Sequence, residues 1–352
     1  MDAVIHKNKA TLRITDPSRY SPASTAATTN VMNVLHGISA HAVGAGGNCE
    51  TTMAYSIVPW IVAPVAQNDQ NTVLFASFDG ADRLVRPVYE SQSIKSFSDT
   101  ENAVVWTKDK NSIALDADKT LNSLVLDNSG LHSQDKQLGV GRTLTLASGG
   151  LVFSGSGAVI GTWNGGTANG SLVLGDANHP AYVWARGSTN SPNQVWAKVT
   201  APGGFVSAYT GNLVLGGDQT GIGDEIAVNA GTLMLGDADH PCLLSKELPI
   251  RIFANATLKL PNASSATGNI LKFDGAAGWF GKVEVPAGVA VKCSKAYWRD
   301  YPETQEWQAL KRGIYGSSES GAPNVRDDLF SGAGTLQILR DDSTMPFFII
   351  VR

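Results

Sequence analysis

Two short stretches of the sequence carry an aspartate and a histidine three residues apart, each time in the order Gly-Asp-Ala-x-His-Pro. The pairs are Asp176 with His179 and Asp237 with His240. A carboxylate beside an imidazole could bind a metal ion or carry out acid–base catalysis. The plainer interpretation is a turn in which the aspartate caps its own backbone and the histidine precedes a proline. We favour the turn, because no third or fourth ligand recurs beside either pair.

Four aspartates each close a short apolar stretch and could form a column along the molecule: Asp127, Asp176, Asp218 and Asp237. If the chain is built from stacked coils, equivalent side chains come close together and could hold Ca²⁺. Repeats that bind calcium in this way carry dense Gly-Gly-x-Gly-x-Asp runs, which this sequence lacks. Turn capping is again the interpretation that we favour, and we predict no metal or cofactor site.

Two further groups of charged residues were candidates for a carbohydrate-active enzyme, which needs paired carboxylates, or a carboxylate–metal site with a basic residue, on one face. The first group is Lys108, Asp109, Lys110, Asp116, Asp118 and Lys119. The second group is Arg299, Asp300, Glu303 and Glu306. We interpret the first as a solvated loop and the second as an exposed face. Because the sequence also has no Gly-x-Ser-x-Gly elbow and no Walker-type loop, it predicts no catalytic residue.

The eight tryptophans could line a groove that binds carbohydrate: Trp60, Trp106, Trp163, Trp184, Trp196, Trp279, Trp298 and Trp307. Burial against the strands is the plainer expectation for most of these rings. The three cysteines, Cys49, Cys242 and Cys293, are far apart and odd in number. They form neither a Cys-x-x-Cys pair nor a disulfide framework, so we expect small buried apolar residues.

The elements that must position these residues are short strands. A Leu-x-Leu unit followed by Gly, Asp, Asn or Ser recurs from TLNSLVLDNSG (120–130) to KVEVPAGVAVKC (282–293). Alternation of period two over about five residues is the signal of a strand. The aspartates that close successive units are spaced by about one or two steps of ~20–24 residues, which is the period of a solenoid coil. Inward aliphatic residues of one coil are buried only when the next coil stacks on it.

The composition agrees with this fold. Charged residues make up 16% of the 352-residue chain, against about a quarter in ordinary globular proteins, so charged helical surfaces must be scarce. We predict an all-β, right-handed parallel β-helix (β-solenoid) over residues 1–296, with an irregular, decorated segment near 56–118. Residues 297–352 are predicted to form a small C-terminal cap and closing strands. The cap is expected to include a helix over Tyr297–Lys311, because Trp307 and Leu310 are three residues apart and Gly313 follows.

Two Asp-Gly dipeptides, Asp79–Gly80 and Asp274–Gly275, lie between strand-like runs and could each close a local hairpin. No such dipeptide joins two Leu-x-Leu units, which favours the parallel β-helix over a sandwich.

Several longer stretches resemble bacterial proteins with autotransporter-associated β-strand repeats. They are IAVNAGTLMLGD, TLNSLVLDNSG, GRTLTLASGGLVFSGSG, YSIVPWIVAP with FASFDGADRLVRP, and RGIYGSSESGAPNVRDDLFSGAGTLQIL. The resemblance implies a secreted or surface-exposed passenger-type β-helix with an adhesive or structural role. This chain shows neither a signal peptide nor a C-terminal translocator barrel, so we expect a passenger-like part rather than a complete autotransporter.

The functional expectation is an extracellular structural or adhesive β-solenoid that is not an enzyme and self-associates or binds a glycan. The apolar Met345–Val351 could add a strand to a neighbouring subunit. The alternatives are a carbohydrate-active β-helix enzyme (a polysaccharide lyase or hydrolase) and a carbohydrate-binding module. The net charge of −4 without a basic patch argues against nucleic acid. No apolar run reaches the ~18 residues that a membrane span needs, so we expect no membrane insertion.

Overall fold

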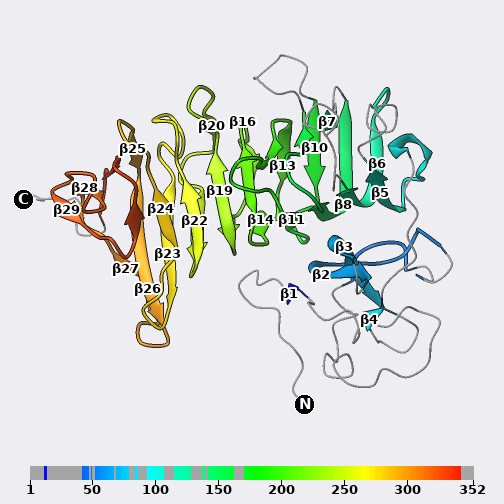
Figure 1. Ribbon diagram of the computed structural model, residues 1–352, viewed down its shortest axis with the longest axis horizontal. Coiled ribbons are helices and arrows are strands. Elements are labelled where there is room, and N and C mark those ends of the chain that lie inside the picture. The colour runs from blue at the N-terminus through cyan, green and yellow to red at the C-terminus, as the bar shows by residue number, and fades with distance from the viewer. Residues whose placement is uncertain are drawn as a thin grey trace, which may run out of the picture.

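The computed structural model of the protein describes residues 12–13, 42–46, 49, 52–66, 69–78, 84–85, 93–106, 115–127, 137–138, 142–161 and 170–341. These residues form an all-β solenoid of about seven turns, whose strands lie side by side along the long axis of the molecule (Figure 1). They contain no α-helix and a single 3₁₀ turn, η4, at Ile94–Ser96. The predicted parallel β-solenoid is therefore confirmed.

Each complete coil contributes a strand to each of three faces, and equivalent strands of neighbouring coils pair in parallel. The first face contains the starts of β6 (Lys119–Asp127) and β8 (Thr143–Phe153), β10 (Ser171–Leu174), β13 (Lys198–Ala201), β16 (Gly217–Asp218), β17 (Gly221–Ile222) and β20 (Cys242–Leu243). The second contains β5 (Asn102–Trp106), the ends of β6 and β8, β11 (Ala181–Ala185), β14 (Phe205–Ala208), β18 (Ile226–Val228), β21 (Pro249–Phe253), β23 (Ile270–Ala276) and β26 (Lys295–Tyr301). The third contains β7 (Gln137–Leu138), β9 (Val159–Ile160), β12 (Asn193–Val195), β15 (Asn212–Leu215), β19 (Gly231–Leu235), β22 (Ala256–Lys259), β24 (Lys282–Glu284) and β30 (Phe330–Ser331).

The inward side chains stack in columns and make one continuous core. On the third face, Leu213 pairs with Leu233, and Leu233 pairs with Leu258. All three side chains are fully buried, and burying each one stabilises the fold by about 1.5–3 kcal/mol. The Leu-x-Leu units are therefore the strands that the alternation predicts, with their leucines inside.

A second, smaller sheet covers part of the second face from outside. This cover sheet contains β1 (Leu12–Arg13), β2 (Val58–Ala66), β3 (Asp69–Phe78) and β4 (Leu84–Val85), in that order. Its buried residues form a second apolar cluster with the outward side chains of the solenoid, which include Tyr182, Trp184 and Val206. The indole Nε1 of Trp184 donates a hydrogen bond to the Pro59 carbonyl oxygen at 2.9 Å.

A buried polar network joins the segment before β2 to the first rungs of the second face. Asn102 Nδ2 donates to the Tyr55 carbonyl oxygen at 2.8 Å, and Asn122 Nδ2 donates to Asn102 Oδ1 at 2.8 Å. Ser123 Oγ donates to the same Asn102 oxygen at 2.7 Å. Because buried polar groups are stable only when they are hydrogen-bonded, these bonds fix the register of β5 against β6.

The predicted helix over Tyr297–Lys311 is wrong. Residues Lys295–Tyr301 form β26, which pairs in parallel with β23 over seven register positions. A short strand, β27 (Gln308–Ala309), then returns antiparallel to it. Pro302 lies inside the expected helix, where a proline removes a backbone donor and clashes with the preceding turn, whereas strand pairing continues the ladder of the second face.

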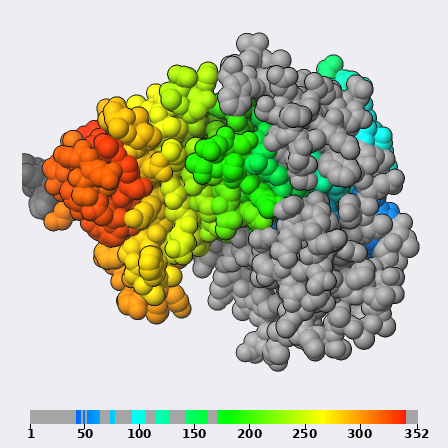
Figure 2. All heavy atoms as spheres, viewed as in Figure 1, coloured from blue at the N-terminus to red at the C-terminus, as the bar shows by residue number. Residues whose placement is uncertain are grey.

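The C-terminal end is a four-stranded sheet in the order β25 (Ala290–Cys293), β31 (Thr335–Ile338), β28 (Gly313–Gly316) and β29 (Asn324–Val325). In Figure 2 these last strands, in orange and red, form the blunt end of the molecule. Among the described residues, β29 pairs with β28 alone and is therefore an edge strand of this sheet.

The Asp274–Gly275 dipeptide lies within β23 and does not close a hairpin. The tight turn follows it, where Ala277 and Gly278 have φ values of 52° and 80° and the Ala276 amide bonds the Trp279 carbonyl at 2.9 Å. Asp79–Gly80 lies outside the described residues.

Candidate functional site

The two Gly-Asp-Ala-x-His-Pro stretches form the same turn. Asp176 Oδ1 accepts the backbone N–H groups of Asn178 at 2.7 Å and His179 at 3.0 Å. Asp237 Oδ1 accepts those of Asp239 at 2.9 Å and His240 at 2.7 Å. In both turns the histidine Nδ1 lies 3.0 Å from the Oδ1 of its aspartate. The hydrogen bond from His179 lowers the pKa of Asp176 below its usual range.

The glycine before each aspartate is required by this geometry. Gly175 and Gly236 have φ values of 62° and 78°. A Cβ at either position would lie about 2 Å from the carbonyl oxygen of the turn histidine, at 1.9 Å for Gly175 and 2.2 Å for Gly236. The turns therefore need glycine twice over, for the left-handed backbone and for the close approach.

The structure does not bring the four strand-closing aspartates together. Asp127 ends β6 on the second face, and Asp176 follows β10 on the first. Asp218 lies within β16 on the first face, whereas Asp237 follows β19 on the third. The near-duplicate turns thus sit at different corners of the solenoid. Among the described residues, no three His, Cys, Asp or Glu side chains are close enough to hold a metal ion together.

Asp218 caps the turn and also forms two side-chain hydrogen bonds. Its Oδ1 accepts the Thr220 hydroxyl at 2.6 Å, and its Oδ2 accepts Lys198 Nζ at 2.9 Å. These bonds, that of Thr220 first, lower the pKa of Asp218 to about 2.

We expect the Asp218 carboxylate to make the fold slightly acid-sensitive. Because its folded pKa is depressed, its stabilising contribution is complete above the unfolded pKa of about 3.9 and is lost as the pH falls toward about 2. The aspartate and lysine side chains are 47% and 50% exposed, so solvent screening keeps the effect below about 1 kcal/mol. Urea unfolding at pH 7, 4 and 2.5 should show a smaller acid-induced loss of stability in Asp218→Asn than in the wild type. An unchanged acid profile would contradict this assignment.

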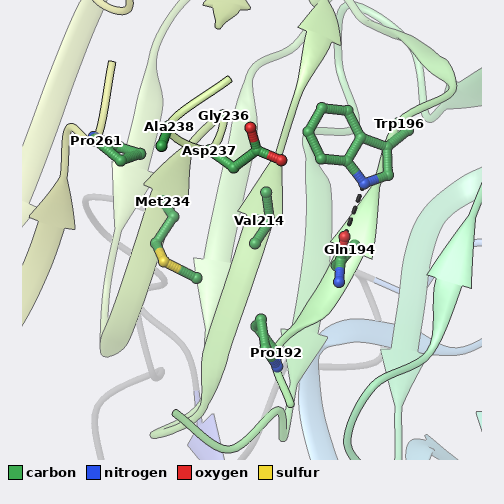
Figure 3. A pocket seen from close by; sticks show the side chains of 9 residues that line it. All are labelled: Pro192, Gln194, Trp196, Val214, Met234, Gly236, Asp237, Ala238 and Pro261. Carbon is green, nitrogen blue, oxygen red and sulfur yellow. Dashed lines mark hydrogen bonds between the residues drawn. The ribbon is translucent and has the colours of Figure 1, made fainter. Parts of the chain in front are cut away.

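A shallow apolar pocket of about 190 Å³ lies on the outside of the third face, beside the second of the two turns (Figure 3). Val214 of β15 lies at its centre, with Met234 of β19 on one side and Trp196 on the other. Pro192 and Pro261 complete the walls. Outward residues of adjacent strands meet here because Val214 and Met234 are paired in register.

Trp196 is held in place by Gly216, Gln194 and His240. A Cβ on Gly216 would lie 2.1 Å from Trp196 Cζ3, so only glycine leaves room for the indole. The indole Nε1 donates to Gln194 Oε1 at 2.8 Å, and the ring packs against the His240 imidazole at a centroid distance of 5.9 Å. The second turn therefore supports one wall of the pocket.

Two polar groups stand at the pocket. Gln194 is 6% exposed. Because an indole N–H can only donate, its amide oxygen must face Trp196, and Nε2 points the other way (Figure 3). No described residue accepts a hydrogen bond from this Nε2. Among the described residues, the one hydrogen-bonding partner of Asp237 Oδ2 is His240 Nδ1, at 3.3 Å, because Oδ1 makes the bonds of the turn.

No family model, curated protein or solved structure matches this sequence. The function must therefore be argued from the β-solenoid and the surfaces that it carries.

Most of the described tryptophan rings are covered. Trp60, Trp184 and Trp196 are 6%, 2% and 2% exposed, and Trp298 packs against the core. Trp279, at the turn after β23, is 69% exposed. The side chains of Trp106 and Trp163 lie outside the described residues. The described rings thus do not form a row of exposed platforms, and the expectation of burial holds for most of them.

The expected exposed face around Arg299 contains a buried ion cluster instead. Arg299 and Arg251 both bind Asp274: Arg299 Nε donates to Oδ1 at 2.7 Å and Arg251 Nε donates to Oδ2 at 2.7 Å. The side chains of Arg251, Asp274 and Arg299 are 9%, 7% and 19% exposed. Trp307 lies over Arg299, with the guanidinium carbon 4.5 Å from the ring centroid. Glu303 and Glu306 are exposed as expected, whereas Asp300 is partly buried and its carboxylate accepts the Gly278 backbone N–H at 2.9 Å.

The described members of the first charged group, Asp116, Asp118 and Lys119, lie at or near the surface. Asp116 pairs with Lys95 Nζ at 2.8 Å, and Asp118 Oδ1 accepts the Thr143 backbone N–H at 2.8 Å. Lys119 Nζ donates to the Phe97 carbonyl oxygen. Lys108, Asp109 and Lys110 lie outside the described residues.

All three cysteines are buried, and no disulfide joins them. Burial raises the pKa of Cys293 to about 12, and it raises that of Cys242 as well. A reactive cysteine needs a lowered pKa and access to solvent, so these two thiols are packing residues of the solenoid core.

Proposed function

We propose that this chain is an extracellular structural or adhesive β-solenoid of the passenger type found with autotransporter-associated repeats. The observation that carries the proposal is the exposed apolar end of a continuous parallel stack. Ile314, Val325 and Leu339, all at the C-terminal end sheet, are 41%, 50% and 38% exposed. An edge strand with exposed apolar side chains is a template for pairing with another chain.

The proposed role is self-association at this end, so that rods join or attach to a larger surface structure. Among the described strands, β29 is the edge of the end sheet and carries Val325, and Ile314 lies on the neighbouring β28. The proposal assigns no reaction to the chain. Met345–Val351, a further candidate for strand addition, lies outside the described residues. No helix among the described residues has the length and hydrophobicity to cross a membrane.

The experiment is light scattering after size-exclusion chromatography, together with negative-stain electron microscopy, over a range of protein concentrations. We expect the wild type to form end-to-end assemblies as the concentration rises, and Val325→Lys to stay monomeric because a lysine on an edge strand opposes pairing.

Leu243→Lys is the matched control, because Leu243 is 48% exposed but lies on β20, away from the end. Wild-type protein that stays monomeric throughout, or equal loss of assembly in both variants, would overturn end-to-end association.

A further inference from the structure

We infer that the pocket on the third face is a subsite for one pyranose ring of a neutral saccharide. The inference rests on the proposed adhesive role and names the ligand for it. It starts from the combination found at Val214, Met234 and Trp196, an apolar floor and walls with one hydrogen-bond donor and one acceptor beside them.

The apolar part fits the carbon face of a sugar ring. Ligand pockets are mostly apolar, with a few placed polar groups that set orientation. Val214 and Met234 form a floor whose width is the spacing of two paired strands, about 4.8 Å. A pyranose ring is of that size, and one of its faces carries C–H bonds in axial positions. Pro192 and Pro261 close the pocket on opposite sides with rigid rings that lose no rotamer freedom on binding.

The polar part fits hydroxyl groups. Gln194 Nε2 is a donor whose direction is fixed by the bond from Trp196 to the amide oxygen, and the Gln194 side chain is 6% exposed. Among the described residues Nε2 has no acceptor, so a ligand hydroxyl can accept its hydrogen bond. Asp237 Oδ2 is an acceptor held in place by the turn bonds of Oδ1. A hydroxyl both donates and accepts, so adjacent ring hydroxyls satisfy both groups.

The two copies of the turn have the same internal hydrogen bonds but different neighbours. Asp176 and His179 form the same bonds at the corner after β10. The residue two places before its glycine is Val173, which occupies the position of Met234 in the repeated sequence. The Trp196–His240 contact and the adjoining Gln194 occur only beside the second copy among the described residues. This duplication supplies an internal control.

The test is saturation-transfer difference NMR on the full chain with methyl β-D-glucopyranoside, methyl β-D-galactopyranoside and N-acetylglucosamine as probes. We expect at least one probe to receive saturation, most strongly at H-1, H-3 and H-5 on its apolar face. Met234→Arg fills the pocket and should reduce the signal at least fivefold. Val173→Arg, the matched change at the first turn, should leave it unchanged.

Asp237→Asn tests the same subsite if Met234→Arg does not fold. It keeps the Oδ1 acceptor of the turn, exchanges the Oδ2 oxygen for an NH₂ donor and should weaken the signal several-fold. Silence of all three probes with the wild type, or equal signals in wild type and Met234→Arg, would overturn the subsite. So would a signal that is lost in Trp279→Ala instead, because binding would then be at the exposed turn. End-to-end assembly is measured separately, so silence of the probes leaves that proposal standing.

Discussion

Replacing Asp274 by asparagine is expected to lower the free energy of unfolding by about 3–5 kcal/mol, because it leaves buried charges without a counterion. Asp274 is the carboxylate between the guanidinium groups of Arg251 and Arg299. Its bonds raise the pKa of Arg299 above its usual value, and arginine side chains in general are not deprotonated in proteins. An asparagine keeps the shape of the side chain but carries no negative charge. Guanidinium chloride unfolding followed by circular dichroism measures the difference.

The cluster also predicts a compensating variant. Removing all three charges together, as in Arg251→Met, Asp274→Leu and Arg299→Met, should change stability far less than Asp274→Asn alone, since no unpaired charge remains. Asp218→Asn is the control for an exposed ion pair and should change stability by less than about 1 kcal/mol. If Asp274→Asn were as mild as Asp218→Asn, the cluster would not be a stabilising element.

The strands of this protein are readable from sequence, because alternation fixes which side chains can be inside. Leu233 and Leu235 must share one side of β19, and stacking on Leu213 and Leu215 of the previous coil follows from the repeat. The composition also argues against charged helices over most of the chain, because charged residues make up 16% of it. The predicted helix over Tyr297–Lys311 was wrong because the spacing of Trp307 and Leu310 is a local signal. The pairing of Tyr297 with Lys272 on the neighbouring coil decides the structure instead.

The candidate sites depend on contacts between coils, which the linear sequence conceals. Asp274 bonds Arg251 and Arg299, which are 23 and 25 residues away and one coil distant on either side. The sequence neighbours of Arg299 therefore do not reveal its ion-pair partner Asp274. Gln194 and Asp237 reach the same pocket from different coils. The corner that a turn occupies depends on the lengths of all preceding loops, so two nearly identical turns ended on different corners.

Truncating Trp184 to alanine is expected to release the cover sheet while the solenoid beneath it persists. Trp184 is 2% exposed and belongs to the cluster under β2 and β3, not to the columns inside the solenoid. Removing a buried indole lowers stability by about 3–5 kcal/mol. Because the side chain points outward from β11, that loss should fall on the contact with the cover sheet. In hydrogen exchange, amides of Val58–Phe78 should exchange more than a hundredfold faster, since every 1.4 kcal/mol is a factor of about ten.

Trp184→Phe separates packing from hydrogen bonding at the same position. Phenylalanine keeps most of the buried ring but leaves the Pro59 carbonyl without the donor that bonds it at 2.9 Å, so the loss should be about 1–3 kcal/mol. Amides of β12 and β15, on the third face of the solenoid, should keep wild-type protection in both variants, because their inward residues belong to the other apolar cluster. Equal loss of protection in the cover sheet and in β12 and β15 would show that the two apolar clusters unfold as one unit.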